Sequence, residues 1–126
     1  MEALILAIAL NANVSPDLLL AVCYQETKLV NIDTRNDGKS TSYGPCQTKK
    51  IASRQVAMDH LDITEPRNSI EIAAKYLKYG INKCGGIRSG LAFYNSGKCI
   101  DRPKRGGYTD KVLAHYNDYK LKRRIE

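Results

Sequence analysis

The chain has 126 residues, of which 43% are hydrophobic and 26% are charged. This composition is typical of one soluble globular domain with its own hydrophobic core, and it excludes a disordered or membrane-spanning chain. Twenty Lys and Arg residues against thirteen Asp and Glu residues give a net charge of +7, which favours a polyanionic partner such as nucleic acid, an acidic membrane surface or an anionic cell-wall polymer.

The first predicted helix runs from Glu2 to Asn11 and contains an apolar run from Ala3 to Leu10. This run follows an acid instead of a basic segment, and it is too short to span a bilayer. We therefore expect a core helix here, and neither a signal peptide nor a transmembrane segment.

The second predicted helix, from Pro16 to about Leu29, begins with an N-cap serine, a proline at its first position and an acid in its first turn. Every residue from Leu18 to Cys23 is apolar, so this part of the helix is expected to be surrounded by the rest of the domain. Glu26 follows at the edge of that core. Burial would raise the pKa of its carboxyl toward the range of a general acid, whereas a surface glutamate in a last helical turn is the simpler alternative.

The polar stretch from residue 31 to residue 44 is predicted to be a loop, with a short hairpin that turns at Asp37-Gly38. A third helix is expected from about Thr48 to Leu61. The fourth is expected to begin with Asn68 as its N-cap, in a capping box with Glu71, and to end at Gly85-Gly86.

Two further helices are predicted at about residues 88–94 and residues 109–122. In the last of these, Val112, Leu113, Tyr116 and Tyr119 are expected to face inward. The chain is therefore predicted to be mainly α-helical.

The four cysteines include no C-x-x-C pair and are accompanied by only two histidines, so no metal site is expected. Cys84 and Cys99 could close a loop with a disulfide worth about 3 kcal/mol, and reduced thiols are the alternative. Cys23 is expected to be a small buried hydrophobic residue that pairs with Cys46 only if the fold brings the two together.

Three polar segments interrupt the core-forming pattern: Gln25-Glu26-Thr27, Ser42-Tyr43-Gly44-Pro45-Cys46-Gln47 and Ala92-Phe93-Tyr94-Asn95-Ser96-Gly97. In this order they resemble the segments E-S, G-L-M-Q and A-Y-N-A-G of the soluble lytic transglycosylase domains, which cleave peptidoglycan on a lysozyme-like fold. The resemblance continues to Tyr108 and Val112, and it covers nearly the whole chain. The sequence departs from the family pattern at two places. Thr27 stands in place of serine, and Pro45-Cys46 stands in place of Leu-Met. The second departure alters an apolar wall of the sugar site.

The resemblance implies one domain over residues 1–126, with a lysozyme-like fold of about six helices and a polar loop or small β-hairpin after the catalytic helix. Glu26 matches the single catalytic acid of the family. Gln47, Tyr94 and Asn95 match residues that bind substrate in the cleft. Thr27 retains the hydroxyl of the family's serine, and Tyr43 is a weaker candidate for a stacking wall.

The implied reaction cleaves the β-1,4 bond between N-acetylmuramic acid and N-acetylglucosamine and leaves 1,6-anhydro ends. Glu26 would act as acid and then as base, with no cofactor or metal. Asp17 lies nine residues earlier, roughly 13.5 Å along the same helix, and is too far away to assist. Asp33 or Asp37 could fold back as a second carboxylate, in which case the chain would be a hydrolytic muramidase.

The expected partner is the glycan strand of peptidoglycan, and a monomer is expected. With no signal peptide, we expect delivery to the cell wall by a bacteriophage or virion, or loss of a signal from the natural protein. A basic nucleic-acid-binding domain is the alternative of another class, although the basic residues are spread over the chain and no reader motif stands out.

Overall fold

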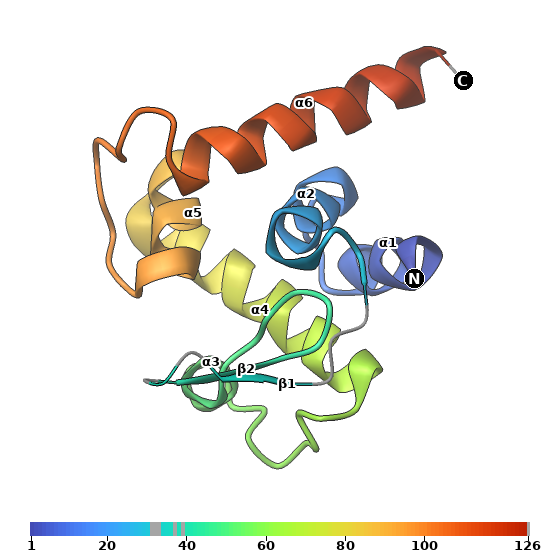
Figure 1. The fold of residues 1–126 in the computed structure, drawn as a ribbon, viewed down its shortest axis with the longest axis vertical. Coiled ribbons are helices and arrows are strands. Elements are labelled where there is room, and N and C mark those ends of the chain that lie inside the picture. Colours follow the sequence, from blue (N-terminus) through green and yellow to red (C-terminus); the bar gives the residue numbers. More distant parts are fainter. Residues whose placement is uncertain (31–33, 37, 39, 126) are drawn as a thin grey trace.

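The computed structural model describes residues 1–30, 34–36, 38 and 40–125, and nothing is described for residues 31–33, 37, 39 and 126. The described part contains six helices and one antiparallel hairpin (Figure 1), which confirms the mainly helical, lysozyme-like fold. The elements in chain order are α1 (Glu2–Asn11), α2 (Pro16–Thr27), β1 (Thr34–Asn36), β2 (Thr41–Tyr43), α3 (Lys50–Gln55), α4 (Pro66–Cys84), α5 (Ile87–Ser96) and α6 (Tyr108–Ile125).

Helix α4 separates two layers, with α1, α2 and α6 on one side and the hairpin and α3 on the other (Figure 1). The larger core joins buried side chains of α1, α2, α4, α5 and α6. All six residues from Leu18 to Cys23 are at most 2% exposed, which confirms that α2 has no solvent face there. No helix in the described part of the chain combines the length and apolar character needed to cross a membrane.

Helices α4 and α5 approach each other closely through two glycines. A Cβ atom added to Gly90 would lie 2.7 Å from the Cα atom of Ile81. A Cβ atom added to Gly80 would lie 2.7 Å from the ring of Phe93. Both positions therefore require glycine for the observed packing of α5 against α4.

A second, smaller core lies on the other side of α4 and holds α3 in place. Its buried members are Ala52, Ile63, Ile72, Tyr76 and Phe93. Because Ala52 of α3 packs into this cluster, even a helix of six residues is fixed relative to α4.

The predicted extent of the third helix was wrong, since α3 covers only Lys50–Gln55. At its start, the backbone of Thr48 forms two hydrogen bonds with Tyr43 and is extended. At its end, Ala57 has a φ of 58°, in the left-handed region that ends a helix.

The predicted start of the fourth helix was also wrong. Pro66 occupies the first helical position and Glu65 the N-cap position, so no capping box forms at Asn68. The Asn68 side chain instead donates a hydrogen bond to the carbonyl of Asp62 at 3.0 Å. The other helices follow the predictions to within three residues at each end.

The predicted hairpin is confirmed in its two strands, while Asp37 of its predicted turn lies outside the described residues. Its antiparallel register pairs Thr34 with Tyr43, Arg35 with Ser42 and Asn36 with Thr41. An additional antiparallel bridge joins Tyr43 to Thr48 and extends the ladder toward α3. The small sheet thereby places the segment before α3 beside the hairpin.

Candidate active site

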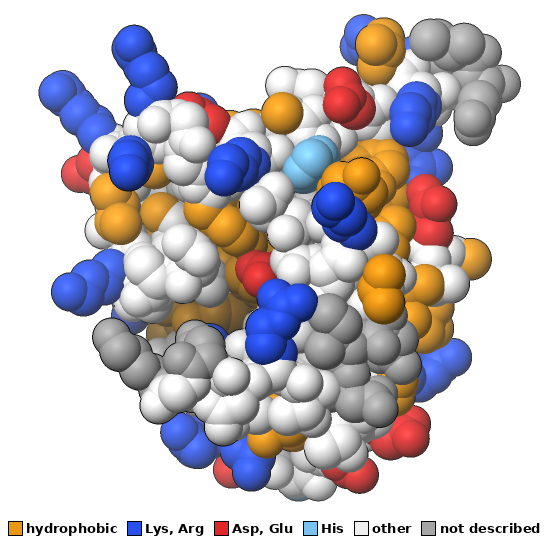
Figure 2. All heavy atoms as spheres, in the orientation of Figure 1, with side chains coloured by type: hydrophobic (Ala, Val, Ile, Leu, Met, Phe, Trp, Pro, Cys, Tyr) orange, Lys and Arg blue, Asp and Glu red, His pale blue; other side chains and the backbone are white. Residues whose placement is uncertain are grey.

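A cavity of about 470 Å³ opens where the end of α2, the hairpin, α3 and the C-terminal turn of α5 meet. Figure 2 shows a hollow on this face, with Lys and Arg side chains beside it. The cavity is lined by Glu26 from α2 and by Tyr94 and Asn95 from α5. Gln47 and Lys49, from the segment before α3, complete the wall next to them.

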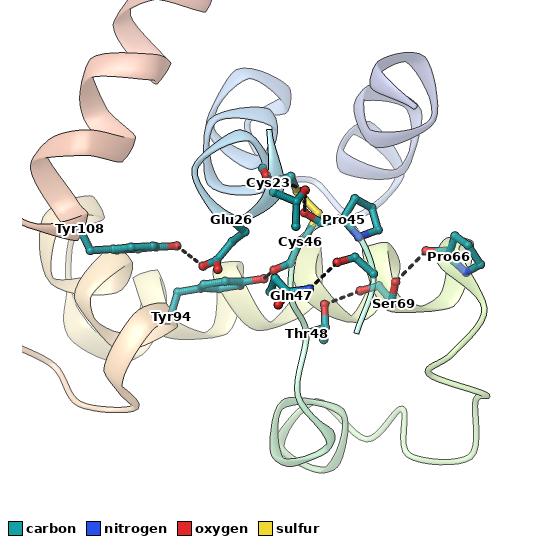
Figure 3. Close-up of a disulfide and its surroundings, with 12 residues drawn as sticks. Cys23, Glu26, Pro45, Cys46, Gln47, Thr48, Pro66, Ser69, Tyr94 and Tyr108 are labelled. Carbon is teal, nitrogen blue, oxygen red and sulfur yellow. Dashed lines mark hydrogen bonds between the residues drawn. A yellow bond between two sulfur atoms is a disulfide. The ribbon is translucent and has the colours of Figure 1, made fainter. Parts of the chain in front are cut away.

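Glu26 lies in the last turn of α2 and is half-buried. The hydroxyl of Tyr108 donates a hydrogen bond to its Oε2 atom at 3.0 Å (Figure 3). Burial raises the pKa of the Glu26 carboxyl, while the Tyr108 hydrogen bond and the charges of Arg35 and Lys49 lower it to a smaller extent. The net result is a carboxyl that holds its proton to higher pH than an ordinary glutamate.

Tyr94 of α5 lines the cavity beside Glu26 (Figure 3). Its hydroxyl donates a hydrogen bond to the carbonyl of Cys46 at 2.7 Å (Figure 3). Burial, and next the negative charge of Glu26, raise the pKa of the Tyr94 phenol well above its ordinary value. Tyr94 is therefore a neutral phenol whose ring is fixed beside the catalytic candidate.

Gln47 reaches the cavity through a tight turn. Its φ is 51°, and its backbone N–H and side-chain Nε2 both donate to the carbonyl of Gly44, at 3.1 and 3.0 Å. Gly44 has a φ of 74°, and a Cβ atom there would lie 2.2 Å from Oγ of Ser69. The glycine of this motif is thus required both by the turn and by the close approach of α4.

The turn is attached to α2 by covalent and polar contacts. A disulfide joins Cys23, one helical turn before Glu26, to Cys46, directly before Gln47. The Thr27 hydroxyl donates a hydrogen bond to the carbonyl of Pro45 at 2.7 Å. The sequence left the pairing of Cys23 open because it depends on the fold. The structure also joins Cys84 to Cys99.

The structure therefore brings together four of the predicted site residues, Glu26, Gln47, Tyr94 and Asn95. Thr27 and Tyr43 do not line the cavity. Thr27 is buried and holds the turn, and Tyr43 packs beside the smaller core.

The candidate second carboxylates, Asp33 and Asp37, lie outside the described residues. Within the described part of the chain, Glu26 is the one carboxylate that lines the cavity. Likewise, no group of three or more His, Cys, Asp or Glu residues there could hold a metal ion.

Three residues near Glu26 were given no role from the sequence. Arg35 and Lys49 lie in polar segments that carry no apolar periodicity. Tyr108 did match a tyrosine of the resembled family, and that match was the signal for its position beside the catalytic candidate.

Comparison with known proteins gives one family match. The model of the family described as "Transglycosylase SLT domain" matches residues 3–117, which confirms the resemblance found in the sequence. No curated protein matches the chain.

Proposed function

This chain belongs to the transglycosylase SLT domain family, and we propose that it cleaves the bond between N-acetylmuramic acid and N-acetylglucosamine with Glu26 as acid and then base. Family membership implies lytic transglycosylase activity on the peptidoglycan of the bacterial cell wall. The observation that carries the finer proposal is the setting of Glu26: half-buried in the cavity, with a raised pKa and with no second carboxylate among the described lining residues.

In the first step, protonated Glu26 donates its proton to the glycosidic oxygen, and the bond from that oxygen to the anomeric carbon breaks. The neighbouring acetamido group of the muramoyl residue assists at the anomeric carbon. The leaving sugar departs with a free hydroxyl, and Glu26 is left ionised.

In the second step, ionised Glu26 accepts the proton of the muramoyl C6 hydroxyl, and the C6 oxygen bonds to the anomeric carbon. This gives a 1,6-anhydro end and returns Glu26 to its protonated form, so no water is consumed. An internal nucleophile is favoured because it is already positioned next to the reacting carbon.

The remaining cavity residues are proposed to orient the sugars. The hydrogen bond to Gly44 fixes the Gln47 amide, whose oxygen would accept from a sugar N–H or O–H group. The ring of Tyr94 would pack against the apolar face of a sugar, and Asn95 would bind its acetamido group.

Product analysis tests the reaction. Purified wild-type chain, Glu26→Gln and the control Glu2→Gln are each incubated with peptidoglycan, and the fragments are analysed by mass spectrometry. Glu2 is an exposed residue of α1, so its variant removes a carboxylate away from the cavity. We expect anhydromuramoyl ends from the wild type and the control, and a loss of about a thousandfold or more in rate for Glu26→Gln with an unchanged circular dichroism spectrum.

Reducing ends in place of anhydro ends would overturn this reaction and would support a hydrolytic muramidase with Asp33 or Asp37 as the second carboxylate. Retained activity of Glu26→Gln would remove the single-acid mechanism. Delivery by a bacteriophage or virion stays a prediction.

A further inference from the structure

We propose that Arg35 and Lys49 form an anion subsite beside Glu26, which binds a carboxylate carried by the lactyl arm of the muramoyl residue. The inference rests on the proposed function and adds to it a feature of the substrate that this chain recognises.

The small sheet brings the two cations to the cavity. Arg35 lies directly opposite Ser42 in the register of the hairpin, and Tyr43 is bridged to Thr48. Lys49 directly follows the bridged Thr48 with an extended backbone, as the N-cap residue of α3. Arg35 and Ser42 are a cross-strand pair, and both line the cavity together with Lys49.

The arrangement of these residues suits a small anion. Neighbouring strands lie about 4.8 Å apart, so the Arg35 side chain starts close to the short side chain of Ser42, and Lys49 enters the same cavity from the segment before α3. Two long side chains that line one cavity can converge on one group. A carboxylate offers up to four acceptor positions to the guanidinium, ammonium and hydroxyl donors.

Neither cation is neutralised by the described part of the protein. The arginines Arg88 and Arg123 form ion pairs with Asp110 and Asp17, whereas Arg35 and Lys49 form no ion pair with any described carboxylate. Glu26 is the one acid in the described lining of the cavity. Its carboxylate accepts a hydrogen bond from the hydroxyl of Tyr108. Among the described residues, the two positive charges therefore share the cavity with Glu26 and have no ion-pair partner.

The effect of Arg35 and Lys49 on the pKa of Glu26 also favours an anionic ligand. The described charged and titratable groups that act on Glu26 are Tyr108 from α6, Tyr94 from α5, Arg35 from β1 and Lys49 from the segment before α3. Arg35 and Lys49 lower the pKa of a carboxyl that must be protonated to act as an acid. A carboxylate bound between them would offset their field, so that substrate binding would favour the protonated form of Glu26.

The chemistry of the substrate supplies this anion. The sugar rings are neutral, and the muramoyl residue carries a lactyl ether on C3, two carbons from its reacting carbon C1. In peptide-free strands the lactyl group is itself a carboxylate. In strands that carry peptides it is an amide, and the carboxylates lie on the attached peptide. Both sources present a carboxylate on the same arm.

The test compares three glycan substrates: strands with intact peptides, strands freed of peptides by an amidase, and peptide-free strands whose lactyl carboxylates are converted to methylamides. The test variant is Arg35→Gln/Lys49→Gln. The matched control is Arg54→Gln/Lys50→Gln, which removes one arginine and one lysine from exposed positions of α3 outside the cavity lining and so has the same net charge.

We expect the KM of the test variant to rise about tenfold on a carboxylate-bearing substrate, with kcat within about twofold, and the KM on the methylamide strands to stay unchanged. The control should match the wild type on all three. A rise confined to the peptide-free strands identifies the lactyl carboxylate as the ligand, and a rise confined to the intact strands identifies a peptide carboxylate. Equal losses on all three substrates, no loss on any of them, or the same losses in the control variant would overturn the subsite.

Binding without turnover separates this inference from the proposed reaction. In a Glu26→Gln background, calorimetry measures the Kd of a soluble muramoyl oligosaccharide with a free lactyl carboxylate and of its methylamide. The test substitutions should weaken binding of the first about tenfold and leave the second unchanged, whatever product the active chain forms. If the wild type forms no anhydro ends, the proposed reaction fails. If the substitutions weaken the binding of neither the free lactyl carboxylate nor a matching oligosaccharide that carries its peptide, the subsite fails.

Discussion

The Glu26 carboxyl lies among groups that act on its protonation in opposite directions. Burial disfavours the charged form, while the Tyr108 hydroxyl and the charges of Arg35 and Lys49 favour it. Burial has the largest effect and the pKa is raised. A group that acts as an acid and then as a base needs both forms within reach, and this balance supplies them.

Tyr108→Phe tests the balance through the pH dependence of activity. The tyrosine hydroxyl stabilises ionised Glu26, so its removal raises the pKa of Glu26 further. The rate falls at high pH because protonated Glu26 is lost, and this limb of the kcat/KM profile is expected to move to higher pH.

Tyr116→Phe, on the same helix and also partly buried, is the control and should leave the profile in place. A limb that stays fixed or moves to lower pH in Tyr108→Phe would contradict the assigned role of Tyr108.

Glu26→Gln is expected to stabilise the fold at neutral pH. The pKa of Glu26 is raised in the folded state, so the stability that this group contributes is fully present below its unfolded pKa and is lost as pH rises through the folded pKa. Glutamine carries no charge and can still accept the Tyr108 hydrogen bond. Thermal unfolding should give a higher Tm for the variant at pH 7 and equal values below about pH 4. A lower Tm for the variant at pH 7 would show that ionisation of Glu26 does not destabilise the folded state.

Part of the site was predictable from residues alone. The continuous apolar run before Glu26 indicated a buried helix, and the order of the motifs identified Gln47 and Tyr94. Tyr108 contacts Glu26 across 82 residues of chain; no local pattern indicates that contact, and only the family resemblance singled out this tyrosine. The positions of Arg35 and Lys49 in the cavity lining depend on how two strands of only three residues each are paired. No alternation of apolar residues in the sequence specifies that register.

At the scale of elements, the cavity depends on how α2 is joined to the turn that carries Gln47. The Cys23–Cys46 disulfide and the Thr27 hydrogen bond to Pro45 connect the two. The hydroxyl of Tyr94 connects α5 to the same turn through the carbonyl of Cys46. Helices α2 and α5, which carry Glu26, Tyr94 and Asn95, are therefore both joined to the turn that carries Gln47.

The two disulfides should differ in their effect on activity although they contribute similarly to stability. They close sequence separations of 23 and 15 residues, so each is worth about 3 kcal/mol in the chain-entropy model. Cys23→Ala/Cys46→Ala should lower kcat about tenfold or more at a temperature where the variant is folded, because it loosens the turn beside Glu26. Cys84→Ala/Cys99→Ala should retain kcat with a comparable loss of stability, measured by urea unfolding. Equal values of kcat for the two variants would contradict the positioning role of Cys23–Cys46.

Helix bounds were predictable where local signals decide them. Ser15 and Pro16 correctly indicated the start of α2, because capping and proline effects act within a few residues. The limits of α3 are decided by the bridge from Thr48 to Tyr43 and by the left-handed conformation of Ala57. Alanine is a strong helix former, so tertiary structure overrides its preference there.

At the scale of the whole molecule, the net charge of +7 is spread widely. Lys and Arg side chains occur at many places on the face around the cavity (Figure 2). The described ion pairs with carboxylates involve only Arg88 and Arg123. A field of this kind attracts an anionic polymer from many directions and does not define one binding groove.

The rate on intact cell walls should therefore fall as the salt concentration rises. We expect salt to weaken the association of enzyme and wall and to leave the chemical step unchanged. The Debye length is about 10 Å at 0.1 M salt and about 3 Å at 1 M, so added salt screens attraction between the basic surface and the wall. We expect kcat/KM on walls to fall about tenfold over this range, with kcat nearly constant. Peptide-free strands with methylamide groups in place of lactyl carboxylates carry no such charge, and their kcat/KM should be almost independent of salt. An equal salt dependence on both substrates would mean that salt acts on the enzyme itself, and the positive charge would then have no part in finding the wall.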